Sequence, residues 1–123
     1  MSAQTVAVVE DNADNRLLLK AILSEQYTLV EYENGVDALA GLTRQRPDVV
    51  LLDISLPGMD GTQILQHIRS DIGLRDLPVI ALTAHAMTGD REKYLSAGFD
   101  DYITKPIVDE NLLLGAIARQ LSR

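Results

Sequence analysis

The fold is decided by the stretch Val49-Val50-Leu51-Leu52-Asp53, which lies near the middle of the chain. Its apolar residues form a run too short for a helix, and a carboxylate follows them directly. A short, continuous apolar run is typical of a strand that is buried on both faces, as in a parallel sheet. Ligands of such sheets bind beyond the carboxyl ends of the strands, so Asp53 is the first candidate for a functional residue.

Four other segments have the composition of strands, and helical patterns separate them. Thr5–Val9 and Val79–Leu82 are again short and apolar, whereas 27–32 and 101–104 alternate and are candidates for edge strands. The apolar positions at helical spacing are Leu17, Leu18, Ala21, Ile22, Val36, Leu39, Ala40, Ile64, Leu65, Ile68, Leu112, Leu113, Ala116 and Ile117. Five βα units in series predict one domain, residues 1–123, with an α/β fold in which helices cover both faces of a five-stranded parallel sheet. One doubly wound order of such a sheet is the flavodoxin-like order 2-1-3-4-5, and we take it as the expected one.

The segment from about residue 86 to residue 97 differs from the other helical patterns. It has helical propensity, but its apolar stripe is weak. A helix with so little apolar surface to bury is a candidate for a mobile or partner-facing element. At other helix starts, Asn12 or Asp14 is expected to cap the first helix and Asp109 the last.

Composition excludes several classes of function. The formal net charge of −7 means that the domain lacks the Lys and Arg surface that direct binding to nucleic acid requires. The absence of cysteine removes disulfides, thiolate catalysis and zinc–thiolate sites. The first residues do not have the pattern of a signal peptide, and no apolar run approaches the ~18 residues of a membrane span. We therefore expect a cytoplasmic protein.

Polar residues directly follow four of the predicted strands. Glu10 and Asp11 follow the first strand, Asp53 the third, Thr83 the fourth and Lys105 the fifth. In the predicted strand order these ends converge on one cleft. Each residue alone has an ordinary explanation as a helix cap, a strand-end threonine or a surface lysine, but their joint placement favours a site.

This set of side chains indicates phosphoryl chemistry. Three crowded carboxylates repel one another, and a hard divalent cation such as Mg²⁺ relieves that repulsion. The lysine at the rim offers a positive charge to an anionic group. A carboxylate nucleophile, a metal and a cation are the parts that phosphoryl transfer to an acid requires.

Four ordered segments of the chain make it resemble the receiver domain of bacterial response regulators over nearly its full length. They are Val8 to Asn12 (VVEDN), Leu52 to Gly61 (LDISLPGMDG), Ala81 to Ala84 (ALTA) and Ala97 to Pro106 (AGFDDYITKP). The resemblance implies a two-component phosphorelay in which Asp53 accepts a phosphoryl group from a histidine kinase or a histidine phosphotransfer protein. A downstream protein is then expected to dock on the face formed by helix 4, strand 5 and helix 5.

The resemblance also implies the ligands of the metal. Asp11 is expected to bind Mg²⁺ directly and Glu10 largely through water, while Asp53 and the backbone carbonyl of Ser55 complete the set. Mn²⁺ is expected to substitute for Mg²⁺. Ser55 and His85 occupy positions at which the family varies and tunes the lifetime of the acyl phosphate, and His85 either contacts the attacking water or has no role.

The residues of the conformational switch follow from the same resemblance. Thr83 is expected to supply a hydroxyl that follows the phosphoryl group, with Lys105 as its cationic partner. Tyr102 matches the aromatic residue that turns inward when Thr83 moves. The peptide bond between Lys105 and Pro106 is expected to be cis, as the family has it.

Two alternatives stay open. The first is a metal-dependent phosphohydrolase with an aspartyl nucleophile, because Asp60-Gly61-Thr62 superficially matches the haloacid-dehalogenase motif; Gly58, however, stands where that motif needs an Asp. A Toprim-like site likewise lacks its second acid, because Ser55 occupies that position. The second concerns the protein in which the domain occurs: a receiver is either free-standing or part of a hybrid histidine kinase or a multidomain regulator. In each case, we expect a receiver to promote only its own phosphorylation and dephosphorylation, and not to act as an enzyme on other substrates.

Overall fold

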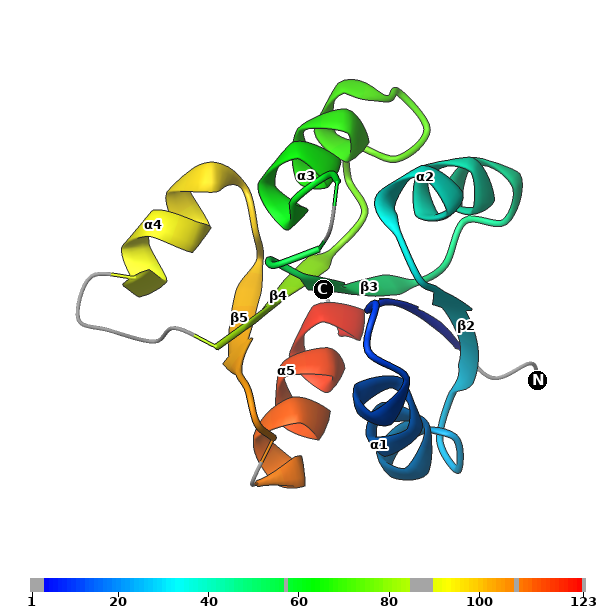
Figure 1. Ribbon diagram of the computed structural model, residues 1–123, viewed down its shortest axis with the longest axis vertical. Coiled ribbons are helices and arrows are strands. Elements are labelled where there is room, and N and C mark those ends of the chain that lie inside the picture. Colours follow the sequence, from blue (N-terminus) through cyan, green and yellow to red (C-terminus); the bar gives the residue numbers. More distant parts are fainter. Residues whose placement is uncertain (1–3, 57, 85–89, 108, 123) are drawn as a thin grey trace.

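Strands and helices alternate along the chain in a computed structural model, which describes residues 4–56, 58–84, 90–107 and 109–122 (Figure 1). The strands within these ranges are Thr5–Val9 (β1), Thr28–Tyr32 (β2), Val49–Asp53 (β3), Val79–Thr83 (β4) and Asp101–Thr104 (β5). The helices are Ala13–Leu23 (α1), Gly35–Arg44 (α2), Gly61–Ser70 (α3), Asp90–Ala97 (α4) and Glu110–Leu121 (α5).

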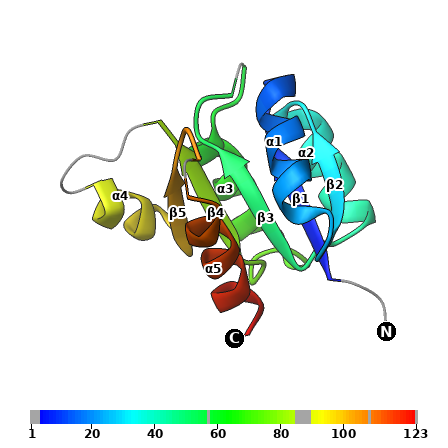
Figure 2. The same ribbon diagram turned by 90° about the horizontal axis from the view of Figure 1, so that it is seen from below.

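The strands pair in parallel in one sheet of order β2-β1-β3-β4-β5. Helices α1 and α5 cover one face of this sheet, and α2, α3 and α4 cover the other (Figure 1 and Figure 2). This arrangement confirms the predicted doubly wound fold and its strand order. It also confirms that the two alternating segments, β2 and β5, are the edge strands.

The core has two halves because side chains alternate across the sheet. On β1, Val6 and Val8 pack with residues of α1 and α5, whereas Ala7 and Val9 pack with residues of α2 and α3. Every residue of β3 and β4 is buried. Burial on both faces explains why these two strands are continuous apolar runs, while the partly exposed edge strands alternate.

Side chains at the carboxyl edge of the sheet cap the helices that begin there. The side chain of Asn12 caps α1 by accepting a hydrogen bond from the N–H of Asn15 at 3.0 Å. Asp60 and Gln63 form a reciprocal capping box at the start of α3, with bonds of 3.0 and 3.1 Å. Asp109 caps α5. These caps lie where the connections after β1, β3 and β5 enter the next helix, and these connections carry most of the candidate site residues.

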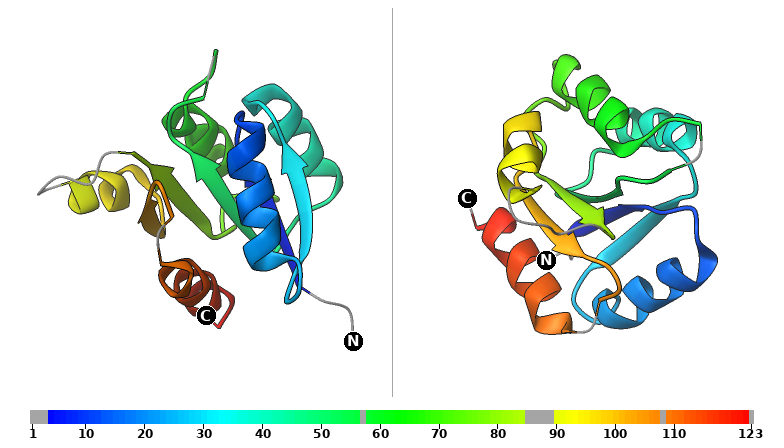
Figure 3. Two further views of the ribbon diagram at one scale, coloured as in Figure 1. Left: turned by 60° about the horizontal axis from the view of Figure 1, so that its bottom comes forward. Right: turned by 60° about the vertical axis from the view of Figure 1, so that its left-hand side comes forward.

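A helix is expected from about residue 86 to residue 97, and the structure describes its part from Asp90 to Ala97 as α4. Residues 85–89, which include His85, lie outside the described ranges. Helix α4 lies beside β5 at one end of the molecule, away from α1 and α2 (Figure 3). The exposed side chains of residues 92, 93 and 95–97 agree with its weak apolar stripe. None of the helices in the described ranges has the length and apolar character that crossing a membrane requires.

Candidate functional site

An acidic cluster lies at the carboxyl ends of β1 and β3. The register of these neighbouring strands pairs Val9 with Leu52, so the residues that follow, Glu10 and Asp53, lie side by side. Asp11 joins them, and the three acids each offer a carboxylate oxygen within 4.8 Å of the others. Glu10 and Asp53 are buried, whereas Asp11 is exposed. The cluster is therefore anchored in the sheet and open to solvent on the Asp11 side.

The ammonium group of Lys105 reaches this cluster from the loop after β5. Its Nζ donates a hydrogen bond to Oδ2 of Asp53 at 3.0 Å and to Oε1 of Glu10 at 3.2 Å. The backbone N–H of Lys105 donates to the carbonyl oxygen of Thr83 at 2.7 Å, which holds the loop against the end of β4. The peptide bond between Lys105 and Pro106 is cis. Lys105 thus bridges two buried carboxylates from a third strand end.

The cluster carries an excess of negative charge, because its carboxylates outnumber the one ammonium group that contacts them. Burial raises the pKa of Glu10 to about 7, and the hydrogen bond and negative charge of Asp53 act in the same direction. Burial alone would lower the pKa of Lys105, but the hydrogen bonds and charges of Asp53 and Glu10 outweigh it and raise that pKa above its ordinary value. One ammonium therefore faces more carboxylates than it can neutralise.

Two residues of α1 that the sequence did not single out hold Glu10 in place. The side-chain amide of Asn15 donates to Oε1 of Glu10 at 3.1 Å. The guanidinium of Arg16 donates from Nη1 to the backbone carbonyl oxygen of Glu10 at 2.8 Å. Their sequence signal is weak, because polar residues near the start of a capped helix ordinarily face solvent. On the other side of the cluster, the N–H of Ser55 donates to Oδ1 of Asp53 at 2.9 Å.

Thr83 lies at the end of β4, next to the strand that carries Asp53. Its side chain is buried, and its hydroxyl oxygen is 2.9 Å from the hydroxyl oxygen of Tyr94 on α4. The ring of Tyr94 in turn lies 6.0 Å from that of Tyr102, measured between ring centroids. Tyr102 is partly buried. The sequence identified Thr83 and Tyr102 as candidates but not Tyr94, which stands between them.

The donor set of the cluster fits a hard divalent cation. Carboxylate oxygens are the ligands that Mg²⁺ prefers, and Glu10, Asp11 and Asp53 supply three of them close together. A cation there would stabilise the charged form of Glu10, whose pKa is raised first by burial and then by the hydrogen bond and negative charge of Asp53. The backbone carbonyl of Ser55 as a further ligand stays a prediction.

The loop after β3 gives no support to the phosphohydrolase alternative. Asp60, which would belong to its motif, instead accepts a hydrogen bond from the N–H of Gln63 and caps α3. Gly58 stands where the first acid of that motif is needed, and it lies exposed in a turn with φ of 80°. This conformation favours glycine over residues with a side chain. The capping of α3 therefore accounts for Asp60, and the conformation of the turn accounts for Gly58.

Comparison with known proteins gives consistent results. A family model described as the response regulator receiver domain matches residues 6–118. The polar-differentiation response regulator DivK of Brucella anthropi is 39% identical over 105 residues, which cover 85% of this chain and 85% of DivK. The sensor protein GacS of Pseudomonas syringae pv. syringae is 40% identical over 114 residues, 89% of this chain. The chain spans only 13% of the length of GacS.

A solved structure resembles the whole chain. The receiver domain of sensor histidine kinase PA1611 from Pseudomonas aeruginosa PAO1 superimposes with a TM-score of 0.89 at 36% sequence identity. The match covers 99% of this chain and 100% of that one. That crystal structure has a magnesium ion coordinated in its active site cleft.

Proposed function

This chain belongs to the response regulator receiver domains of two-component systems, and from that premise we propose that Asp53 accepts a phosphoryl group from a histidine kinase or a histidine phosphotransfer protein. The observation that carries the proposal is the placement of Asp53, buried at the end of β3 with the ammonium of Lys105 at 3.0 Å. We further propose that the domain works in the cytoplasm and promotes only its own phosphorylation and dephosphorylation.

The proposed transfer forms one bond and breaks one. An oxygen of the Asp53 carboxylate attacks the phosphorus, the bond from phosphorus to the donor imidazole nitrogen breaks, and the imidazole keeps that electron pair. The hydrogen bond from Ser55 N–H to Oδ1 and that from Lys105 to Oδ2 orient the carboxylate for this attack. Lys105 then pairs with an oxygen of the transferred group.

We propose that Asp11 and Asp53 bind Mg²⁺ directly and Glu10 largely through water, with the backbone carbonyl of Ser55 as a further ligand and Mn²⁺ as a substitute. When bound, the ion supplies positive charge that stabilises the oxygens of the transferring group. The magnesium ion in the PA1611 receiver domain supports this assignment. So does the fit of the acidic cluster to a hard cation.

We propose that phosphorylation is read by Thr83 and Tyr102. An acyl phosphate carries more negative charge and more acceptor oxygens than the carboxylate it replaces. The hydroxyl of Thr83 can pair with one of these oxygens, which favours an arrangement of the strand end in which Tyr102 turns inward. The population of conformations then shifts toward the state that makes these contacts.

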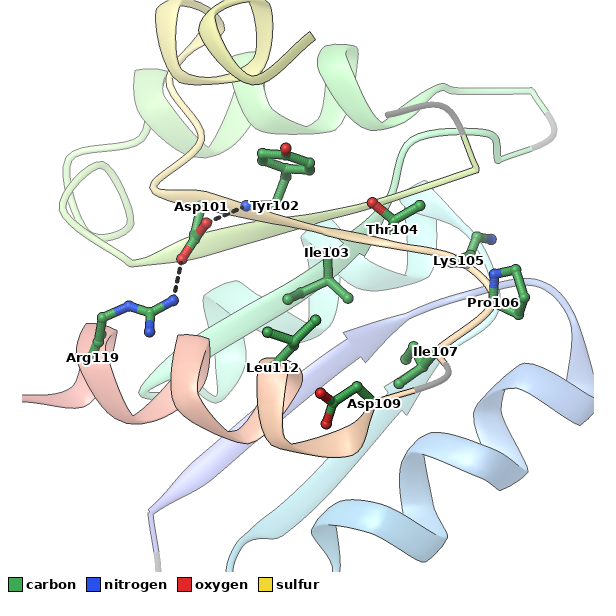
Figure 4. A pocket seen from close by; sticks show the side chains of 10 residues that line it. All are labelled: Asp101, Tyr102, Ile103, Thr104, Lys105, Pro106, Ile107, Asp109, Leu112 and Arg119. Atoms are coloured by element: carbon green, nitrogen blue, oxygen red, sulfur yellow. Dashed lines mark hydrogen bonds and ion pairs between the residues drawn. The ribbon is translucent and has the colours of Figure 1, made fainter. Parts of the chain in front are cut away.

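For the downstream protein we propose the face formed by α4, β5 and α5. A groove of about 460 Å³ runs along β5 and the adjoining end of α5, where Leu112 is 64% exposed (Figure 4). At its other end, Arg119 forms an ion pair with Asp101 at 3.1 Å (Figure 4). Lys105 lines the same groove, so the face adjoins the proposed phosphorylation site.

Intact-mass measurement tests this function. Acetyl phosphate with Mg²⁺ should add the mass of one phosphoryl group to the parent protein and none to Asp53→Asn. The control Asp76→Asn removes an exposed carboxylate outside the cluster and should accept the group as the parent does. A modification that persists in Asp53→Asn would disprove the assignment, as would a parent protein that accepts no phosphoryl group.

A further inference from the structure

A buried pair of hydroxyl groups connects the candidate site to α4. The hydroxyl oxygen of Tyr94 lies 2.9 Å from that of Thr83, so one of the two donates a hydrogen bond to the other. Thr83 is 1% exposed and Tyr94 is 6% exposed, so water does not compete freely for this bond. The bond joins the end of β4 to the middle of the neighbouring helix.

Tyr94 is also the anchor of α4. Among the side chains of residues 92–97, which are the ones described in this helix, Tyr94 alone is buried. Its ring packs edge-on against Phe99 at 6.1 Å and lies tilted against Tyr102 at 6.0 Å. Leu95, the other large apolar residue there, is 37% exposed. The position of α4 therefore depends strongly on the surroundings of one side chain.

The geometry links the state of Thr83 to the position of this anchor. A threonine hydroxyl has one proton to donate, and its direction is set by the rotation of the side chain. If the Thr83 side chain rotates so that its hydroxyl oxygen moves toward a phosphoryl oxygen and away from Tyr94, the hydroxyl of Tyr94 is left in a buried site without this partner, whichever of the two was the donor. A buried hydroxyl that loses its partner is destabilised, so the state in which Tyr94 moves and finds another partner becomes favoured.

We infer that Tyr94 is a positioning residue, which holds the Thr83 hydroxyl in the unphosphorylated protein and transmits its reorientation to α4. This inference rests on the proposed function, because it takes phosphorylation of Asp53 as the event that Thr83 detects. It adds a role for a tyrosine of α4. Phosphorylation should thus loosen α4, because Tyr94, the one buried side chain among residues 92–97, loses its hydrogen bond with Thr83.

Hydrogen exchange of the backbone amides of α4 tests the inference in the whole 123-residue chain. Tyr94→Phe removes the hydroxyl and keeps the ring, so exchange in α4 of the unphosphorylated variant should be about three- to tenfold faster than in the parent, as expected for the loss of one hydrogen bond. Thr83→Val removes the other hydroxyl at similar volume and should have the same effect. The double variant should exchange no faster than Thr83→Val, because in that variant the bond between the two hydroxyl groups is already absent.

A matched control removes a different tyrosine hydroxyl. Tyr27 packs in the core on the opposite face of the sheet, so Tyr27→Phe should leave the exchange of α4 unchanged. Acetyl phosphate with Mg²⁺ should accelerate exchange in α4 of the parent and of Tyr27→Phe, and should add little in Tyr94→Phe. In Tyr94→Phe, phosphorylation should also proceed at least as fast as in the parent, since the hydrogen bond between Tyr94 and Thr83 no longer has to break.

The outcomes separate this inference from the proposed function. If acetyl phosphate modifies the parent at Asp53 but exchange in α4 of unphosphorylated Tyr94→Phe equals that of the parent, the role of Tyr94 is wrong and the proposed function stands. Equal acceleration by phosphorylation in the parent and in Tyr94→Phe would likewise overturn it. If the parent takes up no phosphoryl group, the proposed function is wrong, and the inference that rests on it is wrong as well.

Discussion

The Nζ atom of Lys105 lies 3.0 Å from Oδ2 of Asp53, although 52 positions of the sequence separate the two residues. Glu10 shares the same ammonium at 3.2 Å, so one positive charge faces two buried carboxylates. The charge of Lys105 therefore has two opposing effects at this site. It would repel a metal ion bound to the acids, and it would attract the oxygens of a transferred phosphoryl group.

Replacing Lys105 with methionine should change metal binding and phosphorylation in opposite directions. Mg²⁺ should bind roughly tenfold more tightly, because a like charge a few ångströms away in a partly exposed site costs about 1–2 kcal/mol. Phosphorylation by acetyl phosphate should become slower, because no cation remains to pair with the phosphoryl oxygens. Titration calorimetry measures the first effect and intact mass against time the second.

The control for Lys105 is Lys20→Met, which removes an exposed lysine from the last turn of α1. Both measurements should match the parent within error, because a solvated charge outside the cluster is screened. Weaker Mg²⁺ binding in Lys105→Met than in Lys20→Met would contradict the repulsion between the ammonium and the metal site.

The raised pKa of Glu10 predicts that the metal-free protein loses stability as the pH rises. The pKa is about 7 in the folded protein against an ordinary value of 4.5, so between these values the folded state holds a proton that the unfolded chain has released. The free energy of unfolding should fall across this interval by on the order of 2 kcal/mol from this group. Urea denaturation in EDTA at about pH 5 and about pH 8 measures the difference.

The variant Glu10→Gln isolates this effect. It keeps the size of the side chain and removes the ionisation, so the pH dependence should be weaker and the metal-free variant should be more stable than the parent at about pH 8. Mg²⁺ should stabilise the parent there, since it binds the folded state. An unchanged pH dependence in Glu10→Gln would assign the loss of stability to other groups.

Much of the fold could be predicted because it depends on local pattern. The apolar runs of β3 and β4 are continuous because both faces are covered, and this alone distinguishes them from the alternating edge strands. The convergence of Glu10, Asp53 and Lys105 could also be predicted, because it requires only the strand order and the fact that each residue follows a strand. No side-chain packing enters that inference.

What could not be predicted depends on side chains that meet through packing. Tyr94 lies on a helix with little apolar pattern, so nothing in its sequence indicates that its ring is buried or that its hydroxyl reaches Thr83. Asn15 and Arg16 likewise read as surface residues of a helix start, although both donate hydrogen bonds to Glu10. Such contacts depend on the angle between a helix and the sheet, which periodicity does not fix.

Arg69 provides another such contact and a prediction about stability. Its Nη1 donates to the carbonyl oxygens of Arg75 and Leu77, its Nε and Nη2 donate to that of Gly98, and Nη2 also reaches the carboxylate of Asp100 at 2.9 Å. Arg69→Met would remove all of these hydrogen bonds, most of which are partly buried, so the free energy of unfolding should fall by about 2–4 kcal/mol. Urea denaturation measures it.

The matched control for Arg69 is Arg75→Met. Arg75 is exposed and contributes only its backbone carbonyl to this network, so its replacement should change the free energy of unfolding by less than about 0.5 kcal/mol. Mg²⁺ affinity should be the same in both variants, because the network lies outside the acidic cluster. A stability of Arg69→Met equal to that of Arg75→Met would show that water replaces the guanidinium.

Gly61 connects the packing of α3 to the geometry of Asp53, the proposed phosphoacceptor. A Cβ atom at this position would lie 2.7 Å from the backbone carbonyl oxygen of Asp53 and 2.8 Å from Cα of Ile54. Both are backbone atoms at a buried strand end, so moving them apart costs free energy. Gly61→Ala should therefore destabilise the protein by about 1–3 kcal/mol and, by displacing Asp53, weaken Mg²⁺ binding. Gly73→Ala, with its nearest contact at 3.4 Å in an exposed turn, should change neither quantity. Parent-like Mg²⁺ affinity in a destabilised Gly61→Ala would mean that α3 moves and the strand end does not.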